Sequence, residues 1–147
     1  MKVIIQSLRE EDCTIISAAF SKIGWHKPAS QYRRYTREQA SGTREVLVAW
    51  AGSAFAGHCT ILWKSKYPYF RTRGIPEIMD LNVLPKFRRK KIGTRLMDHA
   101  EAIIKKRSLT AGIGVGLFDL PPIKPVTLLV FLTRCQVSSV ISISTRT

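Results

Sequence analysis

The stretch EIMDLNVLPKFRRKKIGTRLMDHAEAIIKKR, residues 77–107, combines a strand, a basic turn and an amphipathic helix in direct succession. Residues 77–83 are rich in Ile, Met, Leu and Val, which predicts a central buried strand that Pro85 closes. From Ile92 onward, apolar residues recur at helical spacing and charged residues cover the other face. A helix in this position predicts a crossover connection to a further strand at 113–118.

Patterns on either side of this unit complete a mixed sheet. Ser7 and Glu10 form a capping-box pattern, which predicts that a first helix starts there. A second helix is predicted over 29–40, and further strands over the segments 3–6, 45–50 and 55–63. The element order predicts an α/β (α+β) fold, with a mixed central sheet flanked by helices.

The charge of the chain is unusual for a protein of 147 residues. Lys and Arg total 24 against 10 Asp and Glu, a formal net charge of +14, whereas the apolar content of 45% is ordinary for a globular domain. Residues 64–91 hold nine of the basic residues, with Glu77 and Asp80 as the acids. Such a chain attracts polyanions, which include nucleic acid, acidic membrane and phosphorylated small molecules.

Cysteine and histidine usage favours a reduced, metal-free protein. The three cysteines are widely spaced and form no Cys-x-x-Cys motif, which is typical of free thiols in the cytoplasm. His58 and His99 have no partner at metal-ligand spacing, so no metal is expected. The longest apolar run, 126–132, is far shorter than the roughly 20 residues of a membrane span. We therefore expect a soluble cytoplasmic protein without membrane partners.

The basic turn before the helix has the features of an anion site. Main-chain N–H groups at a helix N-terminus lack partners, and the helix dipole adds partial positive charge. Gly93 would allow a ligand to approach the main chain closely, while Arg88 to Lys91 raise the local potential. The alternative is that these basic side chains simply face solvent at the start of the helix. The P-loop, dinucleotide and zinc-finger patterns are absent from the sequence.

These residues resemble a known family. EIMDLNVLPKFRRKKIGTRLMDHAE resembles the acetyl-CoA-binding segment of the GNAT acyltransferase superfamily, and of its small bacterial N-acetyltransferases in particular. GWHKPAS (24–30) and GIGVGLF (112–118) are similar to the same subgroup. The resemblance covers about residues 1–118. It implies a GNAT-like acyl-CoA-binding domain with acetyl-CoA as co-substrate and an amine as acceptor.

The resemblance places the cofactor on particular residues. The family's pyrophosphate loop, R/Q-x-x-G-x-G/A, corresponds to 88–93, and the pantetheine arm pairs with the main chain of 81–83. The implied cofactor-binding residues are Leu81, Asn82, Val83, Arg88, Arg89, Lys90, Lys91, Ile92, Gly93 and Thr94. Lys91 stands where the family has its first loop glycine. If that position needs a positive φ, a lysine there costs conformational energy.

The resemblance also implies roles in catalysis. A Glu eleven residues before the loop often deprotonates the acceptor amine through water, and Glu77 stands at that spacing. A surface carboxylate at a strand end is the alternative for Glu77. Trp25, Tyr67 and Tyr69 occupy segments where the family binds its acceptor. Local packing is the alternative for these aromatic residues.

The chain departs from the family after about residue 118. The segment 119–147 lacks the family's helix-forming tail, and no Tyr follows Tyr69 that could protonate the departing thiolate. We hypothesise a reading-frame change or truncation in the gene, testable by translating all frames beyond codon 118. The tail predicts strands at 126–132 and 137–143 rather than a separate domain. A lost C-terminus would expose a sheet edge, so a homodimer is one expectation.

Three functions remain open at the level of sequence. The first is an acetyl-CoA-dependent N-acetyltransferase with an unidentified acceptor. The second is a catalytically impaired acyl-CoA-binding remnant whose altered tail removed the acid. The third is a nucleic-acid-binding protein that uses the basic segment 64–91, and the missing base-reading motifs make nucleic acid the least favoured partner.

Overall fold

The computed structural model describes residues 2–117, 126–133 and 142–145. The strands and helices are β1 (Val3–Ser7), α1 (Asp12–Ser21), α2 (Ala29–Ala40), β2 (Arg44–Ala51), β3 (Ala54–Leu62), α3 (Pro68–Thr72), β4 (Glu77–Val83), α4 (Ile92–Ile104), β5 (Thr110–Leu117), β6 (Val126–Thr133) and β7 (Ser142–Thr145). A short 3-10 turn, Pro85–Phe87, separates β4 from the basic loop. No helix of this described part is long and apolar enough to cross a membrane.

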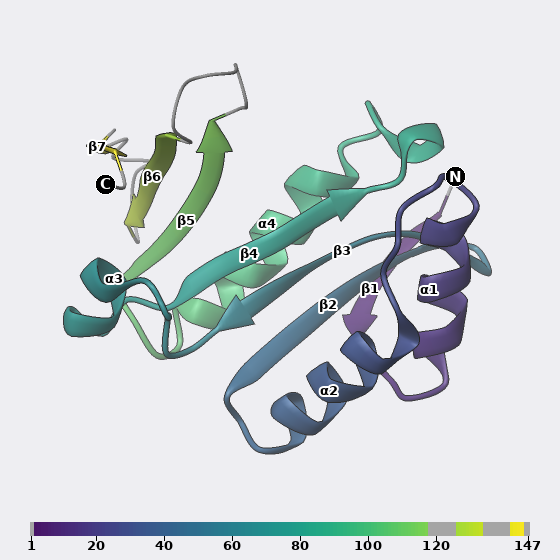
Figure 1. Cartoon of the computed structure of the whole chain (residues 1–147), viewed down its shortest axis with the longest axis horizontal. Coiled ribbons are helices and arrows are strands. Elements are labelled where there is room, and N and C mark those ends of the chain that lie inside the picture. The colour runs from purple at the N-terminus through teal and green to yellow at the C-terminus, as the bar shows by residue number, and fades with distance from the viewer. Residues whose placement is uncertain (1, 118–125, 134–141, 146–147) are drawn as a thin grey trace.

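The strands form one mixed sheet in sequential order, β1 to β7. Neighbouring strands are antiparallel except β4 and β5, which are parallel and joined by α4. The predicted α/β (α+β) class and the crossover are therefore confirmed. α4 covers one face, where Cys59 contacts the Leu96 main chain. α1 and α2 cover the other face, where His58 packs against Phe20 and Tyr32 (Figure 1).

Most predicted elements lie at the expected residues, but the start of the first helix was wrong. Ser7 ends β1, and α1 begins at Asp12. The Asp12 carboxylate accepts a hydrogen bond from the Arg9 main-chain N–H at 3.0 Å, and the Arg9 side chain also pairs with it. Asp12 thus makes the side-chain contact to a preceding main-chain N–H that the capping-box pattern assigned to Glu10.

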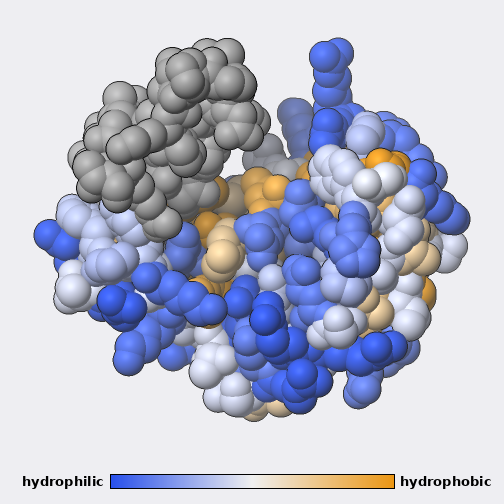
Figure 2. All heavy atoms as spheres, viewed as in Figure 1, coloured by the Kyte–Doolittle hydropathy of each residue, from blue (hydrophilic) through white to orange (hydrophobic). Residues whose placement is uncertain are grey.

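β4 is central in the sheet, but the prediction that it is buried was wrong. Its pairing with β5 covers Glu77 and Ile78 within the described residues, and beyond them the two strands diverge (Figure 1). Ile78 is fully buried, whereas Leu81 is 38% exposed. Figure 2 shows apolar residues exposed in the middle of this face, with hydrophilic residues around them. The apolar residues of β4 therefore lie partly in the core and partly along the stretch of the strand that β5 does not pair with.

A β-bulge lies in the middle of β4. Thr60 pairs with Met79 and His58 pairs with Asn82, so Asp80 and Leu81 together lie opposite one residue of β3. Asp80 has φ +52°. A bulge bends its strand and re-aims a side chain, and it is common beside functional sites.

The strands β3 and β4 approach closely just after this bulge. A Cβ atom on Gly57 would lie 2.5 Å from the main-chain oxygen of Asn82, so only glycine fits at this position. The end of β4 is thereby fixed against β3, which in turn fixes where the basic loop begins.

The tail contributes two strands to the sheet edge. β6 pairs with β5 along its whole length, from Thr110–Thr133 to Leu117–Val126, and β7 pairs with β6. Of the strand predicted at 137–143, residues 137–141 lie outside the described residues. The edge of β5 that the sequence led us to expect as exposed is paired by β6.

Candidate functional site

The basic loop between β4 and α4 has a distinctive main-chain conformation. Arg88 is extended, while Arg89 and Lys91 are both left-handed, with φ +61°. Lys91 caps α4 without a side-chain hydrogen bond to the helix. Lys91 therefore does adopt a positive φ, at a cost of about 1–2 kcal/mol relative to the right-handed region. Such alternation of conformation turns successive N–H groups toward one concave surface, which suits an anion.

A cavity of about 380 Å³ lies over this loop. The residues that line it are Val83, Phe87, Arg88, Arg89, Lys91, Ile92, Gly93 and Thr94. The structure therefore brings together most of the cofactor-binding residues expected from the sequence. Leu81, Asn82 and Lys90 do not line this cavity. Phe87, which is buried and forms part of the wall, was not expected.

The side chains of the loop divide into buried and free groups. Ile92 is 1% exposed and belongs to the core, so its main-chain N–H is what it can offer a ligand. The Arg88 Nε donates to the Val83 carbonyl at 3.1 Å and holds the loop against the end of β4. No ion pair to the basic run Arg88–Lys91 occurs within the described part of the chain. Its positive charge is therefore available to a phosphate.

Gly93 is not required by packing within the protein itself. A Cβ atom there would lie 3.8 Å from the Val83 side chain, an ordinary contact. Gly57 shows the opposite behaviour, since its Cβ would clash with main chain. If a glycine is needed at position 93, the reason is therefore the close approach of a ligand to the loop.

The open edge of β4 leads directly into this loop. Since β5 pairs only with Glu77 and Ile78 among the described residues, the later main-chain groups of β4 that point toward β5 have no strand partner. An extended ligand could pair with them as an added strand would. Edge and loop together would accept a molecule with an amide-bearing arm and a phosphate end.

Glu77 lies at the paired end of β4, opposite Gly112. Its carboxylate accepts a 2.6 Å hydrogen bond from the Ser65 hydroxyl, and Ser65 in turn accepts one from the Tyr67 N–H at 3.0 Å. Ser65 is almost fully buried. The structure therefore connects Glu77 and Tyr67 through a residue that the sequence did not single out, because a lone serine in a loop gives no signal.

The aromatic residues expected at the acceptor site do not form one cluster. Tyr67 and Tyr69 pack with Phe70 around α3, with ring centroids 5.3 to 6.4 Å apart. Trp25 follows α1 and stacks on Phe20 at 5.8 Å. α3 lies beside the start of β4, whereas the end of α1 lies beside its far end (Figure 1). The tyrosines and Trp25 thus mark opposite ends of the strand.

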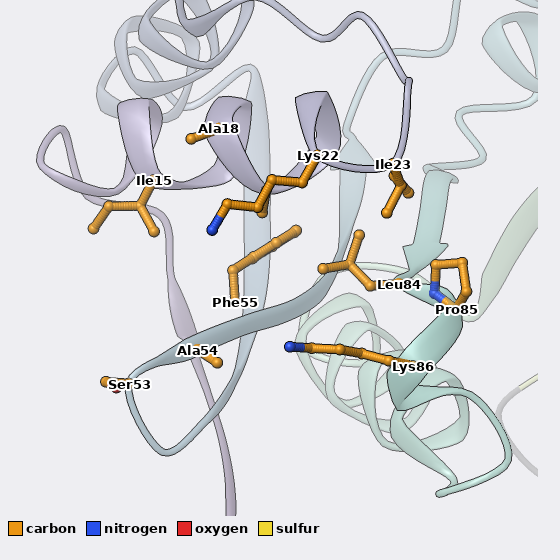
Figure 3. Close-up of a pocket in the computed structure, with 11 residues that line it drawn as sticks. Ile15, Ala18, Lys22, Ile23, Ser53, Ala54, Phe55, Leu84, Pro85 and Lys86 are labelled. Atoms are coloured by element: carbon orange, nitrogen blue, oxygen red, sulfur yellow. The ribbon is translucent and has the colours of Figure 1, made fainter.

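An apolar pocket of about 680 Å³ lies between α1 and the end of β4. Figure 3 shows Phe55 and Leu84 between the Lys22 and Lys86 side chains, which extend in the same direction. Lys86 lines this pocket rather than the cavity over the basic loop. The described residues that line this pocket include no carboxylate.

Polar side chains gather on the α2 face of β4, next to the bulge. The Tyr35 hydroxyl donates to the Asp80 carboxylate at 3.0 Å and accepts from the Gln31 amide at 3.1 Å. The Arg44 guanidinium lies 4.1 Å from the Tyr35 ring centroid and forms a 2.6 Å ion pair with Glu38. Sequence reasoning missed this cluster, because its members lie on three different elements.

His58 lies deeper on the same face. Burial lowers its pKa to about 4, so the ring is neutral near pH 7. Nε2 lies 3.3 Å from the Tyr32 hydroxyl, and Nδ1 is buried without a hydrogen-bond partner among the described residues. Aromatic neighbours on three sides, Phe20, Tyr32 and Phe55, account for this dry environment.

The described residues contain no cluster of three or more His, Cys, Asp or Glu able to hold a metal ion. Cys13 and Cys59 are buried free thiols.

Comparison with known proteins agrees with this geometry. The family model of the GNAT acetyltransferases matches residues 5–117. The chain belongs to the GNAT acetyltransferase family. No curated protein gives a match. The expected resemblance is therefore confirmed, and with it the assignment of this GNAT domain to the acetyltransferase enzymes.

Solved structures share the fold of this GNAT domain at low sequence identity. An N-acetyltransferase from Staphylococcus aureus Mu50 aligns with a TM-score of 0.64 and 16% identity, over 82% of this chain and 77% of that one. The PaiA N-acetyltransferase of Thermoplasma acidophilum, solved with coenzyme A, gives 0.57 and 22%, over 82% and 83%. A ribosomal-protein-alanine N-acetyltransferase from Brucella melitensis gives 0.61 and 15%, over 77% and 74%.

Proposed function

We propose that this GNAT protein transfers the acetyl group of acetyl-CoA to an amine acceptor, and that it acts in the cytoplasm. The observation that carries the proposal is the junction of two features: the open main-chain edge of β4 and the left-handed basic loop that caps α4. The first suits the amide-bearing pantetheine arm, and the second suits the pyrophosphate. The neighbour solved with coenzyme A supports the choice of ligand.

The residues proposed to hold acetyl-CoA divide by the part of the ligand that they meet. Main-chain groups of Leu81, Asn82 and Val83 would pair with the pantetheine arm, and the N–H groups of Ile92, Gly93 and Thr94 would meet the pyrophosphate. Arg88, Arg89, Lys90 and Lys91 would add charge around the phosphates. Bound acetyl-CoA supplies an activated acetyl thioester. Main-chain N–H groups of β4 would polarise its carbonyl.

We propose Glu77 as the proton acceptor for the amine. Ser65 donates a short hydrogen bond to one carboxylate oxygen, and the other oxygen would accept the proton. A primary amine is mostly protonated near pH 7, so a base must remove a proton before the nitrogen can attack. Tyr67, tied to Ser65, and Tyr69 are proposed to line the acceptor site near Glu77, with Trp25 lining its far end.

Titration calorimetry with acetyl-CoA tests the proposal. We expect binding that weakens about 10- to 100-fold in the double variant Arg88→Ala/Arg89→Ala, because two charge-assisted contacts are lost. The matched control is Arg33→Ala/Arg34→Ala, an adjacent exposed arginine pair on α2 that changes the net charge equally. Absence of binding by the wild type at millimolar acetyl-CoA would overturn the proposal.

We propose that residues 1–118 form the acyl-CoA-binding domain and that 119–147 extend its sheet without forming a domain of their own. The pairing of β6 with β5 supports this division. Light scattering of the purified protein measures its mass in solution. A dimeric mass would support the homodimer, and a monomeric mass would refute it.

A further inference from the structure

Asp80 combines three properties that are unusual together. It occupies the bulge of β4, it has φ +52°, and its half-buried carboxylate is held by the Tyr35 hydroxyl. Positive φ is uncommon outside glycine, although Asp and Asn tolerate it better than other residues. Strained residues of this kind gather at ligand sites, where the surrounding structure imposes the conformation.

The orientation of the Asp80 carboxylate is fixed by Tyr35. Burial raises the pKa of Tyr35, and the negative charge of Asp80 raises it further, so the phenol keeps its proton and acts as donor. Tyr35 itself is 4% exposed and is held by Gln31 and by the stacked Arg44 guanidinium. A rigid buried donor therefore aims one carboxylate oxygen inward, which leaves the other for a ligand.

The charge of Asp80 is not neutralised by its neighbours. His58, close enough to sense this charge, is neutral near pH 7 because burial lowers its pKa to about 4. Arg44 forms its ion pair with Glu38, at 2.6 Å. No ion pair to Asp80 occurs within the described segments. In a chain with 24 basic residues, Asp80 is thus a half-buried carboxylate that has no ion-pair partner among the described residues.

We propose that Asp80 binds the ammonium group of the acceptor. The inference rests on the proposed acetyl transfer and names the substrate class: a primary amine that arrives as a cation. A protein of net charge +14 repels such a substrate, so recognition needs a local negative group. Asp80 provides it where β5 leaves β4, beside the edge proposed for the thioester. Glu77 precedes it by about 10 Å of extended strand, so proton transfer to Glu77 runs through water.

A cation titration tests this site without requiring turnover. The probe is n-butylammonium at pH 7, and n-butanol is its uncharged counterpart. Both are titrated into ¹⁵N-labelled protein, with and without coenzyme A, while the amide resonances of Asp80 and Leu81 are followed. We expect saturable shifts with n-butylammonium and none with n-butanol. Equal shifts with both probes, or none with either, would overturn the proposal.

Two variants and a control attribute the shifts to the carboxylate. Asp80→Asn keeps the size and the tolerance of positive φ but removes the charge, and we expect it to abolish the n-butylammonium shifts. Tyr35→Phe should weaken binding about threefold, because the carboxylate stays but loses its orienting hydrogen bond. Asp98→Asn, an exposed acid on α4, should leave the shifts unchanged. Retained shifts in Asp80→Asn would refute the assignment.

The test separates this inference from the proposed function. Failure to bind acetyl-CoA in the calorimetry removes the proposed function, while the butylammonium titration of the free protein still reports on Asp80. For any amine that the wild type acetylates, Asp80→Asn should raise the KM for the amine about tenfold or more. The KM for acetyl-CoA should stay unchanged. A fall in kcat with both KM values unaltered would contradict a binding role.

Discussion

The two sides of β4 are built in different ways. On the α4 side, a contiguous loop presents main-chain N–H groups and exposed cations, and few of its side chains have partners. On the α2 side, side chains from α2, β2 and β4 hold one another in a largely buried network. Where main-chain groups make most of the contacts, a single side-chain change should have a small effect, whereas in a network of side chains it should have a large one. The following predictions test this contrast.

The largest effect is expected from Glu77→Gln. If Glu77 accepts the proton of the amine, kcat should fall about 100- to 10,000-fold while the KM for acetyl-CoA stays the same. Raising the pH should restore part of the rate, because more of the amine is then deprotonated in solution. Steady-state kinetics with an accepted amine measures this. Glu10→Gln, an exposed acid outside the site, is the control, and an equal loss there would indicate a nonspecific charge effect.

The buried His58 should make the α2 side sensitive to acid. Its folded-state pKa of about 4 lies below the ordinary value of 6.5, so between these values the unfolded chain binds a proton that the folded chain does not. The contribution of His58 to the free energy of unfolding is therefore fully present above pH 6.5, and about 3 kcal/mol of it is lost as the pH drops to 4. Urea unfolding of the wild type and His58→Gln at several pH values measures the slope.

His99→Gln is the matched control for this pH dependence, since His99 is exposed on α4. It should retain the slope of the wild type, whereas His58→Gln should lose the part due to this ring, whatever its absolute stability. An unchanged slope in His58→Gln would show that the buried ring is not the group that titrates.

The smallest effect is expected from Lys91→Gly on the loop side. Glycine accepts φ +61° without strain, so the free energy of unfolding should rise by about 0.5–1 kcal/mol once the greater freedom of the unfolded chain is counted. Acetyl-CoA affinity should change by less than about threefold, because the main-chain donors remain. Thermal unfolding and calorimetry measure both. Lys90→Gly is the control, because Lys90 does not have a positive φ, and it should not raise the free energy of unfolding. A large loss of acetyl-CoA affinity in Lys91→Gly alone would show that the Lys91 side chain is essential for binding.

The contiguous parts of this protein were accessible from sequence. The strand 77–83, the loop 88–93 and the helix after it follow one another along the chain, so periodicity and the family resemblance both located them. The resemblance also singled out Lys91 as standing in place of a glycine, and Lys91 has a positive φ in the structure. The cavity over the loop gathers most of the residues expected there, because a turn of this length cannot separate them.

The non-contiguous parts were not accessible. Nothing in the pattern of β4 signals that β5 leaves it after Ile78, and the same apolar residues led to the wrong prediction of a buried strand. A bulge adds one residue to a strand without any change of composition, so the altered direction of Asp80 could not be foreseen. Ser65, likewise, gains its role only through the fold that brings it to Glu77.

The family, the order of elements and the position of the basic loop could be predicted from the sequence, because each depends on residues that are neighbours along the chain. That Asp80 has no ion pair within the described residues is visible only in the tertiary structure, since it depends on Arg44 pairing with Glu38 and on His58 staying neutral through burial. Charge balance at Asp80 is a property of packing between α2, β2, β3 and β4. The chain's net charge of +14 gives no hint of it.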